Sequence, residues 1–84
     1  MWHFKTLCGI FWLVPEETQE GTRFFLGVDE EPLGSYISHE AALMDINHHT
    51  TGYLDWDTHA KTQVPTQLEL WNCGEPHIWH TASC

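Results

Sequence analysis

The sequence predicts an α+β domain: a small antiparallel sheet of three to four strands with one helix packed on one face. Two observations lead to this prediction. Stretches rich in aromatic and β-favouring residues fill the first part of the chain, and a single capped amphipathic helix follows them. Strands that lie close together in sequence favour antiparallel pairing, and the apolar stripe of the helix needs a partner to bury it.

The first three expected strands lie between the N-terminus and residue 37. In the first of them, Gly9 is expected to form a bulge or a break, and Pro15 is expected to end the strand. The acidic segment before the third strand has the composition of a turn. The predicted order is strand 2–14, polar loop 16–21, strand 22–28, turn 29–32 and strand 33–37.

The helix is predicted over residues 39–49. Ser38 is a favourable N-cap, and Glu40 lies in the first turn, where the helix dipole favours an acidic side chain. Gly52 is expected to provide a left-handed stop after the helix. The residues expected to face the sheet are Ala42, Leu43 and Ile46.

Beyond Gly52 the sequence pattern is weaker. Residues 53–62 have no clean period and are expected to form a loop, with Leu54 or Trp56 anchored in the core. Residues 67–71 alternate in polarity and are predicted to form a last strand. The predicted organisation is a single α+β domain over residues 1–72, followed by a C-terminal tail or extra edge strand over residues 73–84.

The charge of the chain is strongly one-sided. Twelve acidic residues face only three Lys and Arg residues (Lys5, Arg23 and Lys61), and the net charge is −9. Nucleic acids and anionic membrane surfaces attract cationic side chains, so we expect neither as a partner. The apolar run at residues 7–14 is too short to span a membrane and is not followed by a cleavage site, so we expect a cytoplasmic protein. Reduced thiols are expected in that compartment, and the alternative is one bridge, for instance Cys73 to Cys84.

Part of the chain, about residues 24–57, resembles a recurring pattern of a hairpin followed by a helix. The motif that carries the resemblance is Gly34-x-Tyr36-x-Ser38-x-x-Ala41-Ala42. It is similar to strings in plant ethylene-response-type DNA-binding domains and in the arm-binding domains of phage integrases. Those families read DNA with Arg and Lys on the sheet, which the matching strand here lacks apart from Arg23. Small bacterial proteins of unknown function resemble the chain more closely, with Trp56-Asp57 after the helix, and they imply no activity.

Several residues belong to types that bind metal ions. The C-terminal Cys and His residues are typical zinc ligands and provide the alternative prediction, a zinc-binding protein, although their spacing matches no standard zinc module. A second group, His48, His49 and His59, is explained without metal by the helix C-terminus, and Asp55 and Asp57 lack the further ligands of a calcium loop. The alternative zinc ligands are Cys73, His77, His80 and Cys84.

No catalytic site and no cofactor are expected. Cys8 with any histidine would be a formal nucleophile and base, but Cys8 lies in an apolar run, where a buried thiol reacts slowly. The chain has no phosphate-binding glycine loop and no nucleophile elbow. We therefore do not expect an enzyme.

The aromatic residues favour a binding function instead. Five Trp residues are many for a domain of 84 residues, so we expect one or two of them to be exposed. The predicted function is a small non-enzymatic interaction module with an acidic, aromatic-bearing surface, and its partner is another protein or a second copy in a homodimer. The candidate partner-binding residues are Tyr53, Trp56, Asp57 and Trp79.

Overall fold

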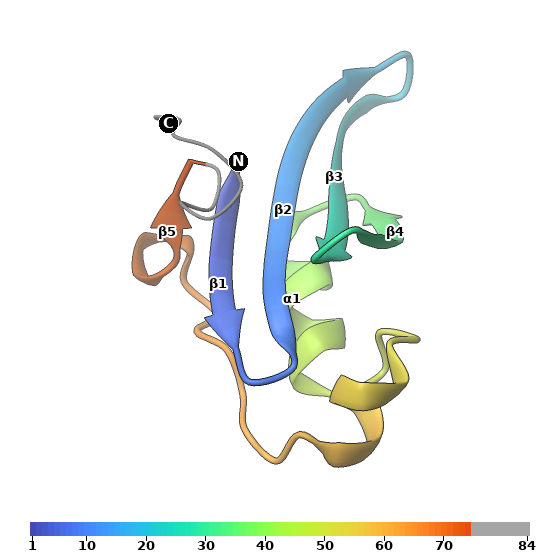
Figure 1. Ribbon diagram of the computed structural model, residues 1–84. Coiled ribbons are helices and arrows are strands. Elements are labelled where there is room, and N and C mark those ends of the chain that lie inside the picture. Colours follow the sequence, from blue (N-terminus) through green and yellow to red (C-terminus); the bar gives the residue numbers. More distant parts are fainter. Residues whose placement is uncertain (75–84) are drawn as a thin grey trace.

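The computed structural model describes residues 1–74 and shows one five-stranded antiparallel sheet with one α-helix (Figure 1). The strands lie in the order β4-β3-β2-β1-β5. The α+β class is confirmed, with five strands instead of the expected three to four. The elements are β1 (Trp2–Thr6), β2 (Gly9–Thr18), β3 (Gly21–Val28), β4 (Glu31–Tyr36), α1 (His39–Asn47) and β5 (Asn72–Cys73).

A tight turn divides the expected first strand into β1 and β2. The hydroxyl of Thr6 donates to the carbonyl of Gly9 (2.8 Å) and accepts from the backbone N–H of Cys8 (3.1 Å). Gly9 has a φ of +141°, a conformation that side-chain-bearing residues rarely adopt. The prediction of one strand over 2–14 is wrong, whereas the break at Gly9 is confirmed.

Pro15 does not end β2, which continues to Thr18. The pairing of β1 with β2 reaches only the Trp2–Leu13 pair, while β3 pairs with β2 along the whole remaining length, including Phe24 opposite Pro15. Within the described part of the chain, β2 beyond Leu13 therefore has a neighbouring strand on one side only, and a residue without an N–H is tolerated at such an edge. The expected loop at 16–21 is reduced to a turn at residues 19–20.

The core lies between the sheet and the segments that follow β4. Along β2 and β3, alternate side chains point to this side, as the period of a strand requires. In Figure 1, α1 lies behind β2 and β3, and its residues join the same buried cluster. The members of the cluster are Phe11, Leu13, Leu26, Val28, Ala42, Leu43, Ile46, Trp56, Val64 and Trp71. The predicted core residues of the helix are thus confirmed.

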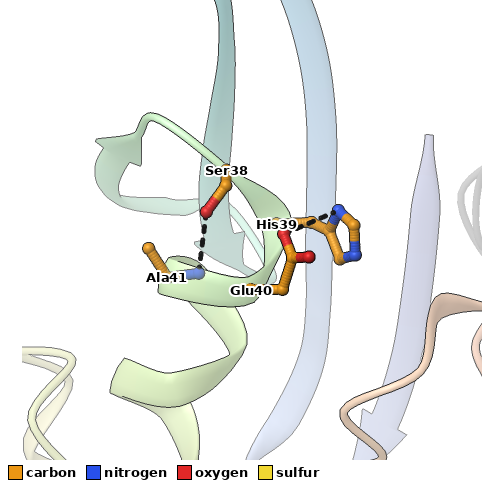
Figure 2. A network of polar contacts seen from close by, with 4 residues as sticks. All are labelled: Ser38, His39, Glu40 and Ala41. Carbon is orange, nitrogen blue, oxygen red and sulfur yellow. Dashed lines mark hydrogen bonds and ion pairs between the residues drawn. The ribbon is translucent and has the colours of Figure 1, made fainter.

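Local hydrogen bonds set the two ends of α1. The Ser38 hydroxyl accepts from the backbone N–H of Ala41 at 3.2 Å, so the predicted N-cap is confirmed (Figure 2). The helix ends at Asn47, earlier than expected, and His49 rather than Gly52 provides the first left-handed residue, with a φ of +58°. The cost of this left-handed conformation is offset by the imidazole of His49, which stacks on Trp56 with ring centroids 5.1 Å apart.

The last part of the described chain differs most from the prediction. Residues 55–59 form one turn of π-helix within the expected loop, and Trp56 is fully buried while Leu54 is exposed, so Trp56 is the anchor. The expected strand at 67–71 is instead a 3-10 turn at Leu68–Leu70. Two i to i+3 hydrogen bonds form this turn, and only Asn72–Cys73 reaches the free edge of β1. A strand over 67–71 is therefore wrong.

The hydroxyl of Tyr36 connects β4 to α1. It donates to Oδ2 of Asp45 at 2.7 Å. Burial, this hydrogen bond and the charge of Asp45 together raise the pKa of Tyr36 from 10.0 to about 12. The folded protein therefore holds the phenol proton more tightly than the unfolded chain does.

A loss of stability at alkaline pH follows from this shift. Because the folded-state pKa of Tyr36 is the higher one, its contribution is complete below pH 10 and is lost as the pH rises through about 12. We expect the urea midpoint of the wild-type protein to fall more steeply across this window than that of Tyr36→Phe. Urea titrations at several pH values between 9 and 12 measure the difference, and parallel curves would contradict the assignment.

Candidate functional site

Trp56, one of the predicted partner-binding residues, is part of the core. Its side chain is fully buried, and its indole N–H donates to the carbonyl of Ile46 at 2.8 Å. Its ring also meets Phe11 edge to face, with centroids 5.1 Å apart. Trp56 therefore offers no surface to a partner, and its role in the described structure is to hold the segment after α1 against the sheet.

Tyr53 and Asp57 belong to the turn around Trp56 and are partly exposed. The carboxylate of Asp57 accepts from the backbone N–H and hydroxyl of Thr51 (3.1 and 2.8 Å) and from the N–H of Gly52 (2.7 Å). The hydroxyl of Tyr53 donates to the carbonyl of Cys8 at 3.2 Å. These contacts shape the turn. Trp79 lies outside the described residues.

Of the alternative zinc ligands, the structure describes only Cys73, which lies on β5 opposite Trp2. Cys73 is disulfide-bonded, so the expectation of reduced thiols is wrong for this residue, and its sulfur is not available as a thiolate ligand. His77, His80 and Cys84 lie outside the described residues. Within residues 1–74, no three His, Cys, Asp or Glu side chains are grouped so that they would hold a metal ion. His48 and His59 are exposed, whereas Nδ1 of His49 lies 3.1 Å from the carbonyl oxygen of Trp56.

Cys8 is half-buried at the turn between β1 and β2. Its sulfur lies 3.7 Å from the backbone carbonyl of Asp55, and this is a contact with an acceptor and not with a basic ring. Cys8 and His59 do line a common cavity of about 490 Å³. A nucleophile needs its base within hydrogen-bond reach, and no such contact joins these two residues in the described part of the chain.

Two adjoining cavities lie between α1 and the segment before β5. The first has a volume of about 520 Å³ and is lined by Trp2, by His39 and Glu40, and by residues 66–69. The second measures about 340 Å³, and the two cavities share Glu40 and Thr66. We call both together the α1 groove. The second cavity is lined by Glu40, Leu43, Met44, Asn47, His48, Gln63 and Thr66.

Asn47, the last residue of α1, fixes the far wall of the α1 groove. Its side-chain amide donates to the carbonyl of Val64 at 3.0 Å, and its side-chain oxygen accepts from the N–H of Val64 at 2.8 Å. One side chain therefore satisfies both backbone groups of a residue in an irregular segment, where β pairing is absent. The wall is held again at Pro65, whose carbonyl accepts from the indole N–H of Trp71 at 2.8 Å.

The helix start positions the other side of the groove. The cap at Ser38 directs the chain so that His39 and Glu40 occupy the first turn (Figure 2). The ring of His39 meets Phe24 edge to face, with centroids 5.9 Å apart, and its Nδ1 lies 3.5 Å from Oε1 of Glu40. Packing thus holds the ring of His39 against β3, while the Glu40 side chain remains 70% exposed at the groove.

The α1 groove combines negative charge with an aromatic surface. Its charged side chains are the carboxylates of Glu40 and Glu69, and neither cavity is lined by Lys or Arg. Trp2 lines the first cavity and is partly exposed. Carboxylates and a Trp ring are the groups that bind ammonium and guanidinium ions, by charge-assisted hydrogen bonds and by cation–π contact.

Sequence reasoning did not find this site, because its residues are far apart in the chain. Trp2 was assigned to a strand and Glu40 to a helix start, and both assignments are compatible with a purely structural role. An exposed methionine on a helix, Met44, was the one local signal, since it interrupts the polar side of α1. Only the tertiary structure brings residues 66–69 beside the start of α1.

Comparison with known proteins gives no further assignment: no family model, no curated protein and no solved structure matches the chain. The function must therefore be argued from the groove itself. Within residues 1–74, no helix has both the length and the apolar character needed to cross a bilayer.

Proposed function

We propose that the protein is a small non-enzymatic interaction module whose α1 groove holds a basic segment of a partner protein. The observation that carries the proposal is the lining of the first cavity, where Glu40 and Glu69 accompany Trp2 without any compensating Lys or Arg. A cavity of this composition favours a lysine or arginine side chain over a neutral or acidic one.

The charge of the whole chain supports the same class of partner. With a net charge of −9, the protein attracts basic partners over a distance and repels phosphate-rich ones. Partner charge raises the rate of association, and the carboxylates in the groove provide the local selectivity. The two effects can be tested separately, because acidic residues outside the groove contribute to the rate of association but not to the local selectivity.

The test compares two double variants with the same change in net charge. Glu40→Gln with Glu69→Gln alters the groove, whereas Glu20→Gln with Glu30→Gln alters two hairpin turns that line neither cavity. The probe is a capped peptide of four lysines, and affinity is measured by calorimetric titration at an ionic strength of about 0.15 M, where charges farther apart than about 8 Å are largely screened. We expect the groove variant to bind about tenfold more weakly, which corresponds to about 1.4 kcal/mol.

The control variant should lose no more than about twofold, because exposed charges far from the ligand are screened. Amide chemical shifts of the wild-type protein should move at residues 39–44 and 66–69 when the peptide is added. Equal losses in the two double variants would show that attraction is general and would overturn the proposed site. Equal binding of a peptide of four glutamates would overturn the class of partner.

A further inference from the structure

The two cavities of the α1 groove differ in chemistry, and the difference restricts the ligand. The first cavity presents Trp2, Glu40 and Glu69. The second is lined by Met44, which is 56% exposed and is therefore the apolar group that a ligand can reach. An exposed methionine adapts its shape to aliphatic groups, so the second cavity suits an uncharged side chain.

From this juxtaposition we infer that the ligand is an extended peptide in which a lysine or arginine and an aliphatic side chain are two positions apart. This inference rests on the proposed function. The basic side chain occupies the first cavity and the aliphatic side chain the second. In an extended chain, residues i and i+2 point to the same side about 6.5–7 Å apart. The cavities adjoin and share Glu40 and Thr66, so side chains this close together can enter both at once.

The wall of the groove is suited to a ligand of defined spacing. Asn47 holds Val64 through two hydrogen bonds of 2.8 and 3.0 Å, and Trp71 holds Pro65 through a third of 2.8 Å. Hydrogen bonds at Val64 and Pro65 thus hold the segment directly before Thr66, which lines both cavities. Preorganisation of this kind reduces the entropy lost on binding and makes the spacing in the ligand selective.

The experiment uses capped pentapeptides of alanine that carry one lysine and one leucine two positions apart, in both orders. Reference peptides replace the leucine by alanine or the lysine by glutamine. The proteins are the wild type, Met44→Gln and Glu69→Gln, and both substituted side chains are exposed, so folding should be preserved. Affinities are measured by titration of amide chemical shifts.

We expect one order of the lysine–leucine peptide to bind at least fivefold more tightly than either reference peptide. Met44→Gln should remove the preference for leucine over alanine and keep the preference for lysine over glutamine. Glu69→Gln should weaken the preference for lysine over glutamine and keep the preference for leucine over alanine. If lysine is preferred but leucine brings no advantage that depends on Met44, this inference fails while the basic-partner function stands. If the lysine preference is also absent, the proposed function fails with it.

Discussion

Trp56→Ala is expected to leave the protein largely unfolded at 25 °C. Among residues 1–74, Trp56 is the largest fully buried side chain, and its removal would leave a cavity between Phe11, Ile46 and the ring of His49. Truncation of a buried aromatic residue costs about 3–5 kcal/mol. A domain of this size has a total stability of the same order, because its core is small.

Urea unfolding followed by far-UV circular dichroism measures this effect. Leu54→Ala is the matched control, since Leu54 is two residues away in the same turn but is 74% exposed. We expect this control to change the free energy of unfolding by no more than about 0.5 kcal/mol. A stable, cooperatively folding Trp56→Ala protein would contradict the central position of Trp56 in the core.

Gly27→Ala is expected to destabilise the sheet by about 1–3 kcal/mol, the usual cost of inserting a group into a well-packed site. Gly27 on β3 faces Trp12 on β2, and a Cβ at this position would overlap the six-membered part of the Trp12 ring. The ring has little freedom to move, because its indole N–H donates to the carbonyl of Asp29 at 2.8 Å. Accommodation of the methyl group therefore requires the loss of that bond or a shift of the strands.

Gly34→Ala provides the matched control for this substitution on the neighbouring strand. The nearest atoms to a Cβ at Gly34 belong to Tyr36, at 3.8 and 3.9 Å, which is ordinary van der Waals contact. Its stability should change little or rise slightly, because alanine has less freedom than glycine in the unfolded chain. Urea titration together with near-UV circular dichroism, which reports the Trp12 environment, distinguishes the two variants. Equal stabilities would contradict the packing of Trp12 over Gly27.

The structure also explains why the prediction of a strand over residues 67–71 failed. The polarity pattern of 67–71 was compatible with a strand, but it also places Leu68 and Trp71 on one side of a tight helical turn. Trp71 is 5% exposed and packs against Phe4, with ring centroids 5.7 Å apart. The choice between the two conformations thus depends on a residue nearly seventy positions away, which no local pattern contains.

The candidate site could be predicted only in its general character. Composition indicated an acidic, aromatic-bearing surface and a protein partner, and the α1 groove supports the proposal that this surface includes Trp2, Glu40 and Glu69. Of the named partner residues, Tyr53 and Asp57 are partly exposed and stay predictions, whereas Trp56 is buried. The sequence pattern allowed Trp56 either as a core anchor or as a partner residue, and its buried ring, with the indole N–H bonded to the carbonyl of Ile46, assigns it to the core.

The sequence by itself determined the elements whose signals are local: the cap at Ser38, the apolar stripe of α1, the break at Gly9 and the extent of β3. A cap, a left-handed glycine and a side-chain period depend on atoms a few residues apart, so they can be read along the chain. The tertiary structure alone decided that β2 continues through Pro15, that Trp56 rather than Leu54 is the buried anchor and that Glu40 and Glu69 line one cavity. Each of these depends on which distant segment lies alongside, and long-range packing makes that choice.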